Sequence, residues 1–223
     1  MQVLSPFTQA LVAAFRQHKD DERAEKMAAY MKHKFAYFGV MATPRNELLK
    51  QVVSAHGLPI NAMQIAKELW LLPERELHYC AIELLLKTKK QWTENTIVDF
   101  EWLVVTNSWW DSVDGIAVNL VGEYFKKWPQ QKEAITEKWN NADNMWLVRT
   151  SILFQLKYRT KTDTDLLAKY CLAHAHQKEF FIKKAIGWAL REYAKTNADW
   201  VEYFIEANDF QQLSVKEALK HIK

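Results

Sequence analysis

The sequence predicts an all-α fold, and two observations support this prediction. Apolar residues recur at helical spacing along almost the whole chain, as in the series Trp110, Val113, Ala117, Leu120 and Val121, and strict alternation of apolar and polar residues is absent. Only five Gly and five Pro occur among 223 residues, whereas average usage of the two would give roughly 12% of a chain. A β-sandwich or a Rossmann-type sheet needs more turns than this composition provides.

Three helix starts can be predicted from capping residues. Thr43 and Pro44 place a hydroxyl before a proline at the first helical position. Pro73 and Glu74 place a proline and an acid in a first turn, and Ser108 begins an S-x-x-D capping box.

Short polar stretches at 140–144 and 160–164 indicate loops between helices. No linker rich in Pro, Ser or Gly divides the chain. We therefore expect residues 1–223 to form a single domain.

Four predicted helical segments follow one another at a fixed offset of 35 residues, at 74–86, 109–121, 144–156 and 179–191. They share apolar positions more than identities. Such a period, with two helices in each repeat, is typical of HEAT-like α-solenoids. The predicted architecture is a HEAT-like α-solenoid of about six antiparallel helix pairs, with inner helices along a concave groove.

Equivalent positions of successive repeats should lie side by side on the inner helices. With a one-residue slip between Cys80 and Asp114, one such column contains Arg45, Cys80, Asp114, Arg149 and Lys184. An acid among cations is unfavourable for phosphate binding alone. Asp114 therefore either neutralises Arg149 or acts on a substrate.

The chemistry of this column suits a polyanion with a reactive sugar. Cations at helical spacing can follow phosphates. A carboxylate near a sugar C1′ stabilises oxocarbenium-like charge and orients water, and aromatic rings can hold a cationic base. The cations concerned are Arg149, Lys183, Lys184 and Arg191, extended by Lys157, Arg159 and Lys161.

Five stretches make a more specific comparison possible: residues 27–44, 68–76, 108–114, 144–158 and 178–197, with SWWDSVD and FFIKKAIGWALREYAK the most distinctive. In them the sequence resembles the AlkD family of bacterial DNA alkylation repair glycosylases. The resemblance implies a HEAT-like solenoid that binds duplex DNA on its concave face. It also implies hydrolysis of the N-glycosidic bond of cationic N3- and N7-alkylated purines, such as 3-methyladenine and 7-methylguanine, at the start of base excision repair, without a cofactor.

The resemblance also assigns site residues. It implies that Asp114 is the catalytic carboxylate, with Trp110 and Arg149 beside it, and that Tyr30 and Trp188 contact DNA. The full set of predicted DNA-binding residues is Tyr30, Trp188, Arg149, Lys183, Lys184, Lys157 and Arg191.

A second class of function stays open: a non-catalytic HEAT-type scaffold that binds distorted or branched nucleic acid or a protein partner. Taken alone, Trp110 and Trp188 are more typical of core packing. The other tryptophans are predicted to pack in the core or between repeats; they are Trp70, Trp92, Trp102, Trp109, Trp128, Trp139, Trp146 and Trp200.

Metal binding and export are not expected. His174 and His176 are the only close histidine pair, and positions i and i+2 do not share a helix face. Cys80 and Cys171 form no disulfide or metal pattern. The net charge is +3, and the sequence has no apparent export signal and no apolar run long enough to span a membrane. We therefore expect a cytoplasmic protein that reaches the bacterial nucleoid through DNA binding. We also expect it to be a monomer.

Overall fold

The structure, a computed structural model, describes residues 4–220. These residues form helices joined by short connections and contain no strand; the nearest approach to one is an isolated bridge between Ala36 and Glu74. The all-α prediction is confirmed. None of the described helices has the length and apolar character needed to cross a membrane.

The chain divides into two compact units, Met1–Asp99 and Phe100–Lys223, and each is described separately. The expectation that residues 1–223 form one domain stays a prediction, as does the concave groove.

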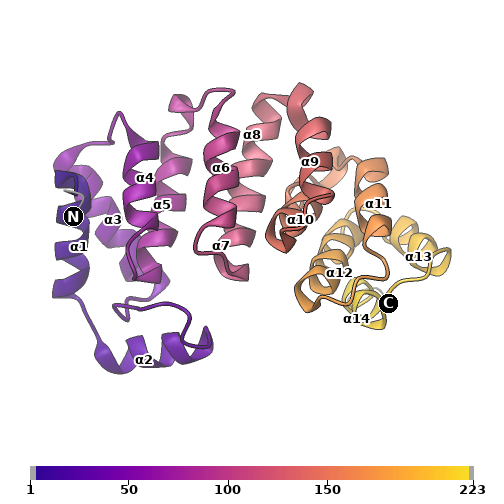
Figure 1. Ribbon diagram of the computed structural model, residues 1–223, viewed down its shortest axis with the longest axis horizontal. Helices are drawn as coiled ribbons and strands as arrows, with labels where there is room; N and C mark the ends of the chain where they lie inside the picture. Colours follow the sequence, from indigo (N-terminus) through magenta and orange to yellow (C-terminus); the bar gives the residue numbers. More distant parts are fainter. Residues whose placement is uncertain (1–3, 221–223) are drawn as a thin grey trace. The chain divides into compact units, whose positions relative to one another are not determined.

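Helices α1, α3, α4 and α5 lie side by side in the first unit (Figure 1), and each of them has buried apolar residues. Helix α1 packs on α3 and α4, and α5 packs on both α3 and α4. Helix α2 differs, because none of its side chains is buried. The bounds are α1 Pro6–Gln17, α2 Asp21–Tyr30, α3 Ala42–His56, α4 Ala62–Trp70, α5 Arg75–Lys87 and the short η1 Lys89–Gln91, and α6 Thr96–Val105 contains the boundary between the units.

The second unit has α10 at its centre, packed against α7, α9, α11 and α12, while α12 also packs against α13 and α14. Helices α7 and α8 belong to one continuous helix, because the π-helical segment η2 joins them. The bounds are α7 Trp110–Gly115, η2 Ile116–Val121, α8 Gly122–Lys127, η3 Pro129–Gln131, α9 Lys132–Asn140, α10 Met145–Leu153, η4 Arg159–Lys161, α11 Thr164–Ala173, α12 Phe180–Ala194, α13 Ala198–Glu206 and α14 Gln212–Ala218.

The 35-residue period appears directly in the helix starts. Helices α5, α7, α10 and α12 begin at Arg75, Trp110, Met145 and Phe180, each 35 residues after the one before. The repeat register deduced from apolar positions therefore corresponds to a real repeat of helices.

Two glycines allow helices of the second unit to approach closely. A Cβ on Gly122 would lie 2.5 Å from the carbonyl oxygen of Phe154, just after α10. A Cβ on Gly187 of α12 would lie 2.4 Å from the Cβ of Glu217 in α14. These distances are shorter than van der Waals contact, so no larger residue fits without displacing a neighbour.

The observed helix starts differ from the predicted ones by one or two residues. Helix α3 begins at Ala42, so Thr43 and Pro44 lie inside its first turn and no side chain caps it. Helix α5 begins at Arg75, so Pro73 precedes it. Ser108 does not cap α7, because its hydroxyl donates to the carbonyl of Val104 at 2.6 Å and so satisfies the end of α6 instead.

Side-chain caps occur at other positions, where a short polar side chain directly precedes the helix; these are Ser5, Asp20, Asn144, Asp163 and Asn197.

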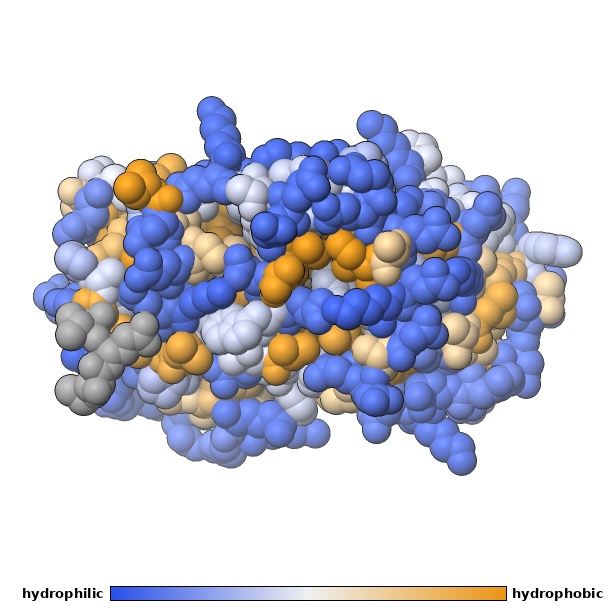
Figure 2. Space-filling view, turned by 45° about the horizontal axis from the view of Figure 1, so that its top comes forward, coloured by the Kyte–Doolittle hydropathy of each residue, from blue (hydrophilic) through white to orange (hydrophobic). Residues whose placement is uncertain are grey.

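On the face drawn in Figure 2, hydrophilic residues predominate and apolar residues occupy separate smaller areas. This is the surface expected of helices that turn an apolar stripe inward.

Candidate active site

Asp114 and Arg149 form a bidentate ion pair in the second unit. The Nε of Arg149 donates to Oδ1 of Asp114 at 2.7 Å, and Nη2 donates to Oδ2 at 2.8 Å. The remaining terminal nitrogen, Nη1, donates to the carbonyl of Phe181. Only 5% of the Arg149 side chain and 12% of the Asp114 side chain are exposed. Two parallel bonds fix the plane of the carboxylate, because the guanidinium is rigid and matches its geometry.

Burial and pairing act in opposite directions on this carboxylate. Burial raises the pKa of Asp114, and the hydrogen bonds and charge of Arg149 partly offset that rise. A carboxylate removed from water without a cation would be very costly. Arg149 thus provides the charge that allows an ionised carboxylate in this place.

A π-helical segment begins two residues after Asp114. Residues Ile116–Val121 form the wider turn, and the side-chain amide of Asn119 donates to the carbonyl of Gly115 at 3.0 Å. The Nζ of Lys157 in turn donates to Oδ1 of Asn119 at 2.7 Å. Such π segments are frequent at functional sites, because the extra residue redirects the side chains around it. Asn119 was missed in the sequence, since its only signal is its position five residues after Asp114.

Three aromatic rings form a cluster next to the ion pair. The ring centroids of Trp109 and Phe181 are 5.2 Å apart, and those of Trp146 and Phe181 are 5.1 Å apart. Phe181 also supplies the carbonyl that binds Arg149. The cluster therefore connects the N-terminal ends of α7, α10 and α12, and it adds apolar surface beside the buried charges. Phe181 was not singled out in the sequence, because nothing there indicates that its backbone carbonyl binds Arg149.

A second group of predicted residues gathers on α12. Lys184, Trp188 and Arg191 lie at positions i, i+4 and i+7, which share one face of a helix. Glu217 of α14 binds both cations, with Nζ of Lys184 at 2.9 Å and Nη1 of Arg191 at 2.6 Å. The hydrogen bond from Lys184 is the main factor that lowers the pKa of Glu217. Glu217 was missed in the sequence, because nothing there places α14 against α12.

The remaining predicted residues are distributed between the two units. Lys183 has no acidic partner among residues 4–220. Trp110 is the first residue of α7, one turn before Asp114, and is half-buried. Tyr30 is the last residue of α2 in the first unit, and 71% of it is exposed.

Other candidate chemistry receives no support. Burial raises the pKa of the Cys80 thiol to about 12, so a thiolate nucleophile is disfavoured. Within the described part of the chain, no three His, Cys, Asp or Glu side chains are grouped as metal ligands.

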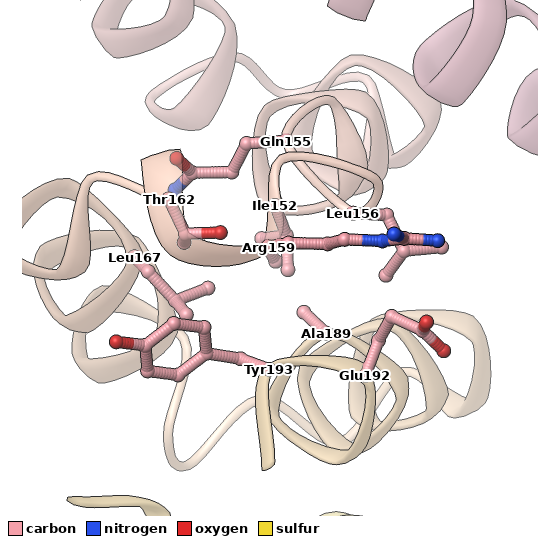
Figure 3. A pocket seen from close by; sticks show the side chains of 9 residues that line it. All are labelled: Ile152, Gln155, Leu156, Arg159, Thr162, Leu167, Ala189, Glu192 and Tyr193. Atoms are coloured by element: carbon pink, nitrogen blue, oxygen red, sulfur yellow. The ribbon is translucent and has the colours of Figure 1, made fainter. Parts of the chain in front are cut away.

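A small hollow in the second unit lies between α12 and the stretch that follows α10 (Figure 3). Its volume is about 10 Å³, which is room for about one water molecule. The charged ends of Arg159 and Glu192 lie on one side of it, and the Tyr193 ring lies on the other. None of the predicted catalytic residues lines this hollow, so it is distinct from the Asp114 site.

The fold and site define an all-α helical-repeat protein with a buried carboxylate held by a guanidinium. A family described as DNA alkylation repair enzyme matches residues 11–222, and the chain belongs to this family. It is also similar to a solved structure described as a predicted DNA alkylation repair enzyme from Enterococcus faecalis. The two are 35% identical with a TM-score of 0.85 over 92% of this chain and 96% of that one. No curated protein matches the chain.

Proposed function

We propose that this protein is a monofunctional DNA glycosylase that hydrolyses the N-glycosidic bond of cationic N3- and N7-alkylated purines in duplex DNA. Membership of the DNA alkylation repair enzyme family supports DNA as the substrate. The single observation on which the proposal rests is the carboxylate of Asp114, held in a fixed plane by Arg149 among largely apolar surroundings.

In the proposed reaction, the bond between C1′ and the purine nitrogen breaks and its electron pair neutralises the positive charge on the base. No general acid is needed, because the leaving group is already cationic. Asp114 stabilises the positive charge that develops at C1′ and orients a water molecule, whose oxygen bonds to C1′ and whose proton passes to solvent. A carboxylate fixed before the reaction does this well, because it need not reorganise as charge develops.

The other residues bind and orient the DNA in this proposal. Trp110 and Trp188 pack on the sugar and backbone of the damaged nucleotide, and Tyr30 of the first unit contacts DNA. Arg149, whose side chain is 5% exposed and directed at Asp114 and Phe181, holds the carboxylate and does not reach a phosphate as the sequence had led us to expect. The phosphate contacts come from the cations Lys157, Lys183, Lys184 and Arg191. We expect the protein to act as a monomer on nucleoid DNA.

The test is release of free base from duplex DNA that contains 7-methylguanine, with a no-enzyme reaction to correct for spontaneous depurination. We expect wild type to exceed the background and Asp114→Asn to fall to it while still binding duplex. Asp111→Asn is the matched control, because Asp111 is an acid on the same helix, and it should retain base release. If Asp114→Asn turns over at the wild-type rate, the catalytic role is wrong. If no variant releases base but all bind duplex, a non-catalytic scaffold is favoured.

A further inference from the structure

The N-terminal end of helix α2 is held in the first unit by hydrogen bonds to Phe38 and Gly39. None of its residues is buried. At its N-terminal end, the backbone N–H of Asp20 donates to the carbonyl of Phe38 at 2.9 Å. The Nη1 of Arg23 donates to the carbonyl of Gly39 at 3.2 Å. The position of the N-terminal end of α2 therefore depends on where residues 38–40 lie.

Residues 38–40 are in turn held by one carboxylate. Glu76 on α5 is completely buried, with 0% exposure. Its Oε2 accepts the N–H of Phe38 at 3.2 Å, and its Oε1 accepts those of Gly39 at 2.8 Å and Val40 at 3.1 Å. Three consecutive backbone N–H groups directed at one carboxylate form an anion-binding concavity, and hydrogen bonds to an ionised acceptor are stronger than neutral ones.

Glycine is required at the centre of this arrangement. Gly39 has φ +85°, a left-handed conformation that side chains disfavour. A Cβ at this position would lie 2.1 Å from the carbonyl oxygen of Asp20 and 2.8 Å from the backbone nitrogen of Ala24. The first turn of α2 thus lies directly against the segment that Glu76 binds.

The same helix forms one wall of an open hollow. Lys26, Met27 and Tyr30 of α2 line it together with Met41 and with Tyr79 of α5, and its volume is about 260 Å³. Tyr79 and Glu76 are one turn apart on α5, so the helix that carries the carboxylate also supplies a wall of the hollow. The location of Tyr30 within the first unit is therefore set by the placement of α2.

We propose that Glu76 is a positioning residue that, through residues 38–40, holds α2 and so places Tyr30 for contact with DNA. The role in DNA contact rests on the proposed function. Glu76 itself is completely buried and acts only through the backbone that it binds.

The test replaces the carboxylate with the amide of equal size, Glu76→Gln, in the full chain. The amide has one acceptor in place of two, and its NH₂ would face backbone donors. The matched control is Glu68→Gln. Glu68 is a 7% exposed carboxylate of the same unit, and it accepts from Ser5 N–H, Ser5 Oγ and Thr8 Oγ1 at the start of α1. It performs the same kind of anchoring without a bond to residues 20–40.

The first readout is hydrogen exchange, which needs no enzymatic activity. We expect Glu76→Gln to raise exchange in residues 20–40 by about ten-fold or more, as loss of charge-assisted hydrogen bonds implies, and Glu68→Gln to leave that segment unchanged. The second readout is affinity for plain duplex in a double-mutant cycle with Tyr30→Ala. We expect the effect of Tyr30→Ala in wild type to shrink strongly in the Glu76→Gln background and to persist in the Glu68→Gln background.

Each outcome either supports or overturns the proposed role of Glu76. Unchanged exchange at residues 20–40 in Glu76→Gln would overturn the proposal, and so would a full Tyr30→Ala effect in that background. If wild type neither binds duplex nor releases base, the proposed function fails, while exchange alone still decides whether Glu76 holds α2. If both Glu76→Gln and Glu68→Gln lower affinity equally without a change in the cycle, Glu76 has only a general structural role and the proposal is wrong.

Discussion

Arg149 directs all three of its side-chain nitrogens at the protein: two at the carboxylate of Asp114 and one at the carbonyl of Phe181. These partners come from α7 and from the start of α12, while Arg149 itself is on α10. One buried guanidinium thus joins three consecutive repeats at the carboxylate that is proposed to be catalytic.

Arg149→Ala is expected to destabilise the protein strongly. It leaves the Asp114 carboxylate buried without its cation, a change that costs about 3 to 5 kcal/mol in comparable buried pairs. Urea unfolding at neutral pH measures this loss. Lys138→Ala provides the control, because the Lys138 side chain is 67% exposed where it meets Glu101, and exposed pairs contribute about 1 kcal/mol or less. Equal losses in the two variants would contradict a tightly coupled Asp114 and Arg149.

The rate of base release is expected to fall on the acid side at a pH above the ordinary aspartate range. Burial raises the pKa of Asp114 despite Arg149, and the nearby Asp111 acts in the same direction. Asp114 is then protonated, and loses the charge that catalysis needs, as the pH falls through this raised value; an ordinary aspartate titrates near about 3.9. Single-turnover rates across the acid range, corrected for spontaneous depurination, measure the profile.

Lowering the pH is expected to affect the stability contribution of Asp114 in the opposite direction to its effect on activity. A raised pKa means that the folded protein binds this proton more tightly than the unfolded chain does. The contribution of Asp114 to the free energy of unfolding is therefore full below the unfolded pKa and is lost as the pH rises through the folded one. Activity should decline in a protein that is still folded, as circular dichroism at each pH can verify. A rate that is constant down to the ordinary aspartate range would contradict the prediction.

Much of the fold could be predicted because it depends on local periodicity. Apolar spacing predicted an all-α chain, and the 35-residue offset located the starts of α5, α7, α10 and α12. Capping was less predictable, since a hydroxyl such as that of Ser108 can satisfy either the helix after it or the helix before it, and here it bonds Val104. Sequence spacing alone cannot decide between the two.

The candidate site could be predicted only where it follows the repeat. Asp114 and Arg149 are equivalent positions of neighbouring repeats, so their pairing follows from the period. Glu217 and the carbonyl of Phe181 depend on how neighbouring helices pack, and a backbone carbonyl has no sequence signal. The prediction that Lys184 and Arg191 bind DNA did not anticipate that both contact Glu217.

Gly122→Ala is expected to destabilise the protein although alanine favours helices. Helix propensity alone would add about 1 kcal/mol of stability. The new Cβ would lie 2.5 Å from the carbonyl oxygen of Phe154, and forcing such an overlap typically costs about 1 to 3 kcal/mol. Thermal and urea unfolding should therefore show a net loss. A gain in stability would mean that the two segments separate easily and that their close approach is not needed.

Glu217→Gln is expected to strengthen binding to duplex DNA. Glu217 neutralises part of the charge of Lys184 and Arg191, and its lowered pKa keeps it ionised at neutral pH. The amide removes that negative charge and leaves both cations. If these cations contact phosphates, the affinity should rise about 3- to 10-fold, and the dependence of log affinity on log salt should steepen by up to about 0.9 for each additional contact.

Fluorescence anisotropy at several salt concentrations measures both quantities. Glu192→Gln is the matched control, since Glu192 is an acid on α12 that pairs with the exposed Lys195 and with none of the predicted DNA-binding cations. It should change affinity much less than Glu217→Gln.

Lys184→Met should act in the opposite direction and weaken binding. If neither Glu217→Gln nor Lys184→Met alters affinity or its salt dependence, then Lys184, with Glu217, serves to join α12 to α14, and the phosphate contacts must come from cations without an acidic partner, such as Lys183.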